Sequence, residues 1–275
     1  MNTNIEMQMN KNIPETDMRE LHIAKQLLDN PGLAARITNY IGMPIEKGFE
    51  MLPKNWNEKV VKITHTAIKK SSEAALFTVK DEPGKKTSNN LHKMAVALTG
   101  GVGGFFGFAG LAVEIPVSTT LILRSIADIA RSQGESIKSV ETKLACMQVL
   151  ALGGKSETDD SAESGYYVTR ALLTKSMAEA AEFIAKKGFI EEGAPVLVRF
   201  FAAISSRFGL QISKKVAAQA VPVVGALSGA ALNTIFIDHF QDMAKGHFII
   251  RKLERLHGKE LIKELYNQTA VPGNS

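Results

Sequence analysis

Hydrophobic positions along this chain recur with the period of an α-helix over most of its length. Stretches that alternate between apolar and polar residues, as half-buried strands do, do not occur at any useful length. The predicted helices cover residues 16–28, 33–41, 55–79, 115–132, 140–152, 165–187, 194–208, 212–220, 226–256 and 259–266. We therefore expect an all-α fold, with a single multi-helix domain over residues 16–267, a disordered segment at 1–15 and a flexible tail at 268–275.

Two stretches depart from this amphipathic pattern because they carry almost no charge. The thirty residues between Lys93 and Arg124 contain one charged residue, Glu114, together with six glycines and one proline. A second stretch, residues 216–237, has no charge and is rich in Ala, Gly and Val. A helix needs roughly 20 apolar residues to cross a bilayer, so each stretch must be buried either in protein or in lipid. They predict two Gly/Ala-rich apolar helical hairpins near the centre of the domain.

Six glycines are concentrated in the first apolar stretch, and three interpretations compete for them. A dinucleotide-binding fingerprint needs GxGxxG after a strand, whereas here Phe106 occupies the third position and no strand precedes it. Overlapping GxxxG pairs, in contrast, let two helix backbones approach closely, in lipid or in a bundle. The third interpretation is a flexible turn between two apolar helices. We favour close packing or a hairpin turn, and the packing residues would be Gly100, Gly103, Gly104 and Gly107.

Three phenylalanines stand among these glycines and are the predicted membrane-contact residues: Phe105, Phe106 and Phe108. Lys85, Lys86 and Lys93 lie close enough in the sequence to favour anionic lipid.

Composition and charge narrow the range of partners. The net charge of +5 is spread along the chain, and only 7% of the residues are aromatic, most of them Phe, which cannot hydrogen-bond to a base. We therefore expect no nucleic acid as a partner. The only cysteine, Cys146, lies in an apolar context and is expected to be a buried small hydrophobe. The polar first 20 residues predict no secretory signal, so we expect a cytoplasmic protein.

Glu114 stands two residues before Pro116, and two interpretations of it remain open. The residue before a proline avoids the helical region, so we expect a helix to begin at Ile115, with Glu114 just ahead of its positive end. A carboxylate there would satisfy free backbone N–H groups. Alternatively, Glu114 is an acid held inside an apolar layer, where ionisable groups often mark a working site.

Four potential ligands lie close together near the end of the second apolar stretch: Asp238, His239, Asp242 and His247. Asp238 and His247 are nine residues apart, so on one unbroken helix they point in about opposite directions. His247 falls on the apolar face, and only His239 with Asp242 is placed to cooperate locally. We favour a core histidine plus a solvated acidic turn over a metal site, for which His239, Asp242 and His247 are weak candidates. The candidate catalytic residues are Glu114, Asp238 and His239.

Two longer segments resemble the signatures of a known family. Residues 104–135, GFFGFAGLAVEIPVSTTLILRSIADIARSQGE, resemble the central signature of the EcsC family, and residues 207–255 resemble its C-terminal signature, including VPVVGALSGAALN and AKGHFIIRKLE. The resemblance covers roughly residues 33–265. It implies a link to membrane transport, because the founding member is encoded beside the subunits of an ABC transporter. Some members are called peptidases, but this chain contains no protease motif.

These observations favour a non-enzymatic, membrane-associated intracellular protein that supports a transport or envelope process. It would lie at the inner face of the membrane, peripherally or partly inserted. We expect membrane lipid or a membrane protein, such as ABC-transporter components, as partner and no cofactor. Two alternatives stay open. One is a metal-dependent or carboxylate-based hydrolase acting on lipid or peptide, and the other is a soluble helical scaffold without lipid contact.

Overall fold

The computed structural model of the chain describes residues 13–29, 32–42, 44–78, 83–84, 107–153, 165–187, 194–221 and 226–269. Within these ranges the chain forms ten α-helices and no strand. The helices are α2 (Glu15–Asp29), α3 (Leu33–Ile41), α4 (Glu46–Glu50), α5 (Trp56–Thr78), α7 (Gly107–Ser132), α8 (Val140–Val149), α9 (Gly165–Lys187), α10 (Pro195–Ala220), α11 (Ala226–His257) and α12 (Lys259–Gln268). The predicted all-α class and single helical domain are confirmed.

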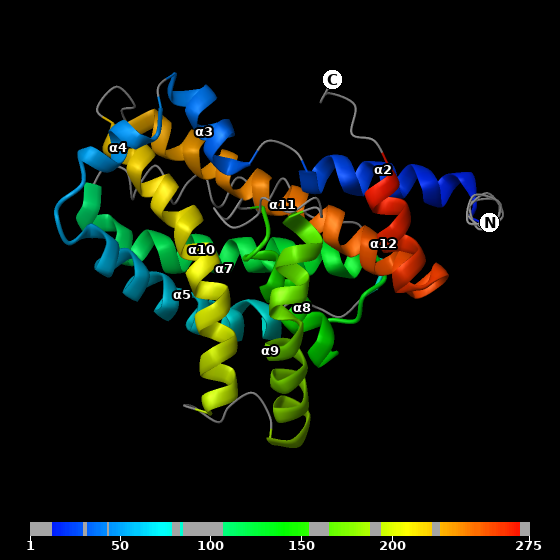
Figure 1. Ribbon diagram of the computed structural model, residues 1–275. Coiled ribbons are helices and arrows are strands. Elements are labelled where there is room, and N and C mark those ends of the chain that lie inside the picture. Colours follow the sequence, from blue (N-terminus) through cyan, green and yellow to red (C-terminus); the bar gives the residue numbers. More distant parts are fainter. Residues whose placement is uncertain are drawn as a thin grey trace.

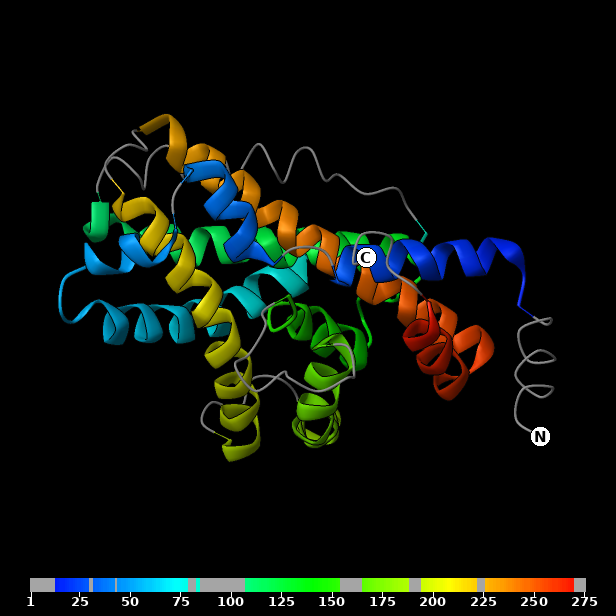
Figure 2. The same cartoon turned by 45° about the horizontal axis from the view of Figure 1, so that its top comes forward.

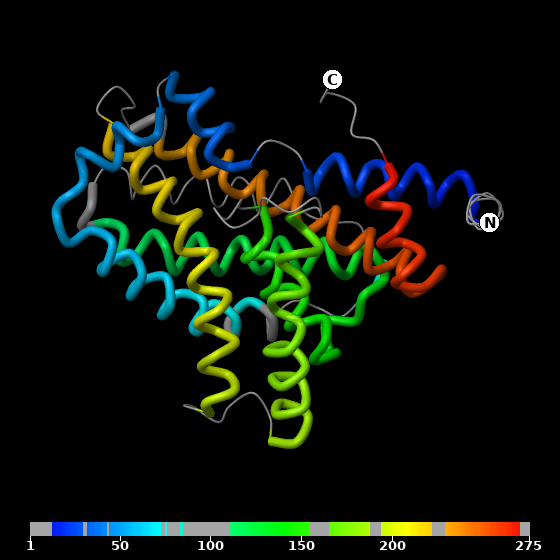
Figure 3. The backbone as a smooth tube through the Cα atoms, viewed as in Figure 1, coloured from blue at the N-terminus to red at the C-terminus, as the bar shows by residue number. Residues whose placement is uncertain are grey.

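Two long helices, α7 and α11, cross the molecule in contact with each other, and the remaining helices pack around them (Figure 1). Helix α5 lies along α7 and runs in the same direction (Figure 3). The hydroxyls of Ser71 and Thr120 hydrogen-bond over 2.9 Å between these two helices. Helices α9 and α10 pack together, and their far ends project away from the two long helices (Figures 1 and 2).

The hydrophobic core is continuous and contains an aromatic cluster between α10 and α11. The ring centroids of Phe208 and Phe240 are 5.4 Å apart, and those of Phe236 and Phe240 are 5.1 Å apart. The edge-on contact of Phe208 with Phe240 joins α10 to α11, whereas that of Phe236 with Phe240 lies within α11. Cys146 is also fully buried, and burial raises the pKa of its thiol, so the prediction of a buried small hydrophobe is confirmed.

Glycine allows two helix pairs to approach closely. A methyl group on Gly48 of α4 would overlap the backbone of Ala217 in α10. A methyl group on Gly246 of α11 would lie 2.6 Å from Cγ of Leu28 in α2. Because any side chain would push these helices apart, both positions need glycine.

Several predicted helix ends agree with the structure, and two predictions are wrong. Helix α3 ends at Gly42, whose φ of 68° is left-handed, as the sequence predicted. The predicted break between residues 208 and 212 is absent, because α10 continues through Gly209. Helix α7 begins at Gly107 and not at Ile115. The short helix α4 was not predicted.

Candidate functional site

Helix α7 contains Pro116 in its interior, and neighbouring hydroxyl groups supply hydrogen bonds around it. A proline has no N–H, so the helix loses one backbone bond at this point. The hydroxyls of Ser71 and Thr120 donate to the carbonyl of Pro116 over 3.1 and 2.8 Å. The helix stays continuous, so Glu114 lies inside α7 and does not precede its first turn. The predicted helix start at Ile115, and with it the interpretation of Glu114 as a helix-start carboxylate, is wrong.

Glu114 forms a buried ion pair with Lys215 of α10. Nζ of Lys215 lies 2.6 Å from Oε1 of Glu114, and both side chains are 1% exposed. The side-chain amide of Gln219 donates to the two carboxylate oxygens over 3.2 and 3.3 Å. The Lys215 ammonium also lies 5.2 Å from the ring centroid of Phe236, on its face. The structure thus places Glu114 inside an apolar layer, where it connects α7 to α10.

Lys215 and Gln219 were missed in the sequence, although their spacing carries a signal. They continue the line of Phe208 and Ile212 along one face of α10, and Phe208, Ile212 and Lys215 are all buried. A lysine on an apolar helical face must have a buried partner, because burying an isolated charge is very unfavourable. Glu114, the one charge in the first apolar stretch, needs a partner for the same reason, but the spacing does not say which residue pairs with which.

The acidic and histidine side chains at residues 238–242 of α11 do not form one site. Asp242 pairs with Arg36 of α3 over 2.8 Å, and Asp238 is partly exposed one turn earlier. His239 is only 1% exposed, and neither of its ring nitrogens has a hydrogen-bond partner. Burial, and then the positive charges of Arg36 and Lys214, lower the pKa of His239 to about 3. Its ring is therefore neutral at physiological pH, and it makes no hydrogen bond to Asp242.

His247 belongs to a separate buried polar cluster that the sequence did not predict. Its Nδ1 lies 3.0 Å from the hydroxyl of Tyr166 in α9. The same hydroxyl accepts a hydrogen bond from Arg170 over 3.2 Å, and Arg170 forms two bonds of 2.6 and 2.9 Å with Glu254. Burial also raises the pKa of Tyr166. The assignment of His247 to the apolar face is confirmed, because the residue is fully buried.

Within the part of the chain that the structure describes, no group of three or more His, Cys, Asp or Glu residues could hold a metal ion. The Glu114 carboxylate pairs with Lys215, whereas the ring nitrogens of His239 have no hydrogen-bond partner. The catalytic roles of Glu114, Asp238 and His239 stay predictions.

The predicted membrane-contact and packing residues fall mainly outside the described ranges. Gly100, Gly103, Gly104, Phe105 and Phe106 are not described, whereas Gly107 and Phe108 are the first two residues of α7. Their predicted roles therefore stay predictions.

Two helices in the described ranges are long and apolar enough to cross a membrane by length and composition. They are residues Gly110–Ser132 of α7 and Pro195–Ala220, which is α10, and each has 56% of its most apolar window buried inside the fold. Core helices of soluble proteins pass the same test. The second apolar stretch of the sequence, 216–237, is shared between the end of α10 and the start of α11.

Comparison with known proteins adds one finding. A family-wide sequence model, described as the EcsC protein family, matches residues 15–253. The chain matches no curated protein and no solved structure. The matched range extends from the start of α2 into the last turns of α11, and it includes Glu114, Lys215 and His239.

Proposed function

The chain belongs to the EcsC protein family, and from this premise we propose that it is a non-enzymatic, membrane-associated intracellular protein that supports a transport or envelope process. It would dock on the inner face of a membrane and contact lipid or a membrane protein, such as components of an ABC transporter. One observation carries the proposal. Two helices have the length and composition of membrane spans, and only 56% of the most apolar window of each is buried in the fold.

One end of the fold carries exposed hydrophobic side chains that are candidates for such contact. This end contains the last residues of α3, the whole of α4, and the first residues of α5 and α7 (Figure 1). Five of the ten exposed large hydrophobic side chains of the described chain come from these helices or their ends: Tyr40, Met51, Val61, Val113 and Val117. Val113 is 69% exposed and Val117 is 41% exposed, and the two lie one turn apart on the same face of α7. We call this set the apolar end.

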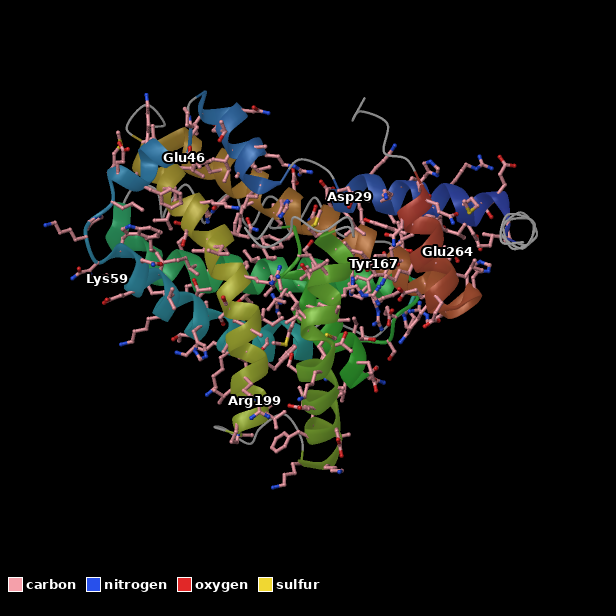
Figure 4. The ribbon with its side chains drawn as sticks, viewed as in Figure 1. Asp29, Glu46, Lys59, Tyr167, Arg199 and Glu264 are labelled. Carbon is pink, nitrogen blue, oxygen red and sulfur yellow. The ribbon has the colours of Figure 1, made fainter. Side chains whose placement is uncertain are left out.

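Basic side chains accompany the apolar end. Five exposed lysines belong to α4, α5 and the segment between them: Lys47, Lys54, Lys59, Lys62 and Lys70. Figure 4 shows Lys59 on the outer side of α5 and Glu46 on α4. Three exposed glutamates, Glu46, Glu50 and Glu58, offset part of this charge. The attraction to anionic lipid would therefore be modest, and apolar contact would contribute most of the binding.

The environments of the candidate catalytic residues favour docking over hydrolysis. The Glu114 side chain is 1% exposed and already paired with Lys215, so it has no access to a substrate from solvent. His239 is equally inaccessible, and no acidic partner orients its ring. A general base needs both access and orientation.

A liposome flotation assay tests the proposal. The purified full chain is mixed with phosphatidylcholine vesicles, with and without phosphatidylglycerol, and floated through a density gradient. The parent protein should float with both, and more with phosphatidylglycerol. The double variant Val113→Ser, Val117→Ser should bind about tenfold or more weakly, because burial of one valine contributes roughly 1.5 kcal/mol or more. A triple variant with Phe105, Phe106 and Phe108 changed to Ser tests the tip predicted from the sequence.

A matched control separates the apolar end from general surface hydrophobicity. Leu172 on α9 and Leu256 on α11 are 63% and 61% exposed and lie outside the apolar end. Changing both to Ser should leave flotation unchanged. Failure of the parent protein to float, or an equal loss in the control, would end the proposal.

A further inference from the structure

One side of α5 continues the apolar end along the molecule. Four residues follow one another on this helix at steps of four, three and four, and so lie along one line: Lys59, Ile63, Thr66 and Lys70. Ile63 is half-buried, and the other three are exposed. Figure 4 shows Lys59 on the outer side of the helix. The line therefore presents two lysines and a hydroxyl group to solvent.

The contact between α5 and α7 fixes where this line lies relative to Val117. Ser71 of α5 accepts a hydrogen bond from Thr120 over 2.9 Å and donates one to the carbonyl of Pro116 over 3.1 Å. Lys70 comes just before Ser71, and Val117 comes just after Pro116. The two helices run in the same direction (Figure 3). In such a pair of right-handed helices, the residue before the contact on one helix and the residue after it on the other lie on the same side.

Burial agrees with this placement. On the opposite side of the contact, Ser72 of α5 and Thr119 of α7 are both fully buried. Val113 lies one turn before Val117, and both valines are exposed. One side of the helix pair is thus buried in the fold, and the other is open to solvent. We call the open side the α5–α7 face, and it consists of Lys59, Ile63, Thr66, Lys70, Val113 and Val117.

The charges of the α5–α7 face are positive. Glu58, an exposed carboxylate of α5, precedes Lys59 by one residue and therefore lies about 100° off the line of the lysines. Glu114 follows Val113 in α7, but its side chain is 1% exposed and pairs with Lys215 inside the fold. The face thus combines lysines with exposed valines. A surface that is anionic outside and apolar beneath is complementary to both.

We propose that the α5–α7 face lies flat on an anionic phospholipid bilayer, with both helices parallel to the membrane plane. The inference rests on the proposed membrane docking and specifies its orientation, because the contact then runs along α5 and α7 and is not confined to the apolar end. Lys59 and Lys70 are separated by about 16 Å along the helix, so they reach different lipid headgroups. Their aliphatic stems and the two valines enter the boundary between headgroups and acyl chains.

Flotation of two matched charge variants tests this orientation. Lys59→Gln with Lys70→Gln removes the two charges of the face, whereas Lys47→Gln with Lys54→Gln removes as many from α4 and the segment after it. One lysine near an anionic surface strengthens binding about fivefold. The first variant should therefore bind phosphatidylglycerol vesicles about 30-fold more weakly than the parent, and phosphatidylcholine vesicles equally well. The second should lose about fivefold or less.

A fluorescent label on the α5–α7 face reports the contact directly. Cys146 is fully buried, so the cysteine of a Thr66→Cys variant is the one that reacts. The Thr66 hydroxyl donates only to the Lys62 carbonyl of its own helix, so the change removes no bond between helices. A nitrobenzoxadiazole label there should shift its emission to the blue when phosphatidylglycerol vesicles are added. The same label on Leu172→Cys, at an exposed position of α9, should not respond.

The outcomes separate this inference from the docking proposal. A blue shift for labelled Thr66→Cys, with the larger loss in the Lys59 and Lys70 variant, supports the α5–α7 face. If the parent floats but the Lys47 and Lys54 variant loses as much binding, or the label on Thr66→Cys is silent, the flat orientation is overturned while docking through the apolar end stands. Failure of the parent to bind any vesicle, as expected if the face instead meets an acidic protein, ends both.

Discussion

Replacing Glu114 with Gln tests whether the buried ion pair with Lys215 stabilises the packing of α7 on α10. The substitution keeps the shape of the side chain and removes its charge, so the Lys215 ammonium remains buried without a counter-charge. Gln219 cannot compensate, because its amide is neutral and donates to the same carboxylate. Removal of one partner from a buried pair costs about 3–5 kcal/mol. For a domain of this size each kcal/mol lowers Tm by about 2–4 °C, so the variant should unfold roughly 10 °C earlier.

The double variant Glu114→Gln, Lys215→Met separates the loss of the pair from the stranding of a charge. Replacement of a whole buried pair by uncharged residues is often neutral or stabilising. The double variant should therefore be more stable than Glu114→Gln alone and recover most of the parent's unfolding free energy. Urea unfolding followed by circular dichroism gives the unfolding free energies of the parent, Glu114→Gln, Lys215→Met and the double variant. The coupling energy between the two positions follows from these four values.

An exposed pair provides the control for this experiment. Glu182 and Lys186 lie 2.6 Å apart in α9, with side chains 67% and 69% exposed. Because solvent screens exposed charges, Glu182→Gln should leave Tm unchanged. The reasoning is refuted if Glu114→Gln behaves like this control, or if the double variant is no more stable than Glu114→Gln.

Three further predictions concern close packing, hydrogen bonding and pH. Gly48→Ala should destabilise by about 1–3 kcal/mol, because the methyl group would overlap the backbone of α10. Gly209→Ala should instead stabilise by about 0.5–1 kcal/mol, because a methyl group there would meet no atom within 4 Å outside the neighbouring backbone of α10, and urea unfolding of both variants measures the contrast. Tyr166→Phe removes the hydroxyl that lies 3.0 Å from His247 and should cost about 1–3 kcal/mol in the same assay. The folded pKa of His239, about 3, lies below the unfolded value of 6.5, so its neutral ring contributes stability above pH 6.5 that is lost as the pH falls towards 3. His239→Met should therefore flatten the fall in unfolding free energy over this range, and a fall as steep as the parent's would contradict the assignment.

Local features of the fold could be predicted from the sequence because their causes are local. The end of α3 follows from Gly42, which adopts a left-handed conformation that other residues avoid. The buried face of α11, including Phe240 and His247, follows from helical spacing alone. The buried state of Cys146 follows from its apolar neighbours in the sequence.

Features that depend on tertiary contact could not be predicted in this way. Lys215 and Glu114 are 101 residues apart, and no local pattern specifies that they meet. Pro116 should have marked a helix start, but α7 continues through it and packs along α5, where Ser71 donates a hydrogen bond to the Pro116 carbonyl. Glu135 accepts hydrogen bonds from Arg251 and Arg255, which lie 116 and 120 residues further along the chain, so these ion pairs could not be predicted from local sequence either. In each case the deciding group comes from another helix or from a contact that only the folded chain creates.

The Glu114–Lys215 pair also limits how the two apolar helices could meet a membrane. Each candidate span contains one half of the pair, because Glu114 lies within Gly110–Ser132 and Lys215 lies within Pro195–Ala220. If α7 and α10 separated and entered lipid individually, each would carry an unpaired charge into the hydrocarbon, at a cost of about 2.5–3.5 kcal/mol or more per charge. Docking with the two helices still paired avoids this cost and uses only side chains that are already exposed, such as Val113 and Val117. The internal electrostatics of the fold therefore favour peripheral contact through the apolar end over insertion of separate helices.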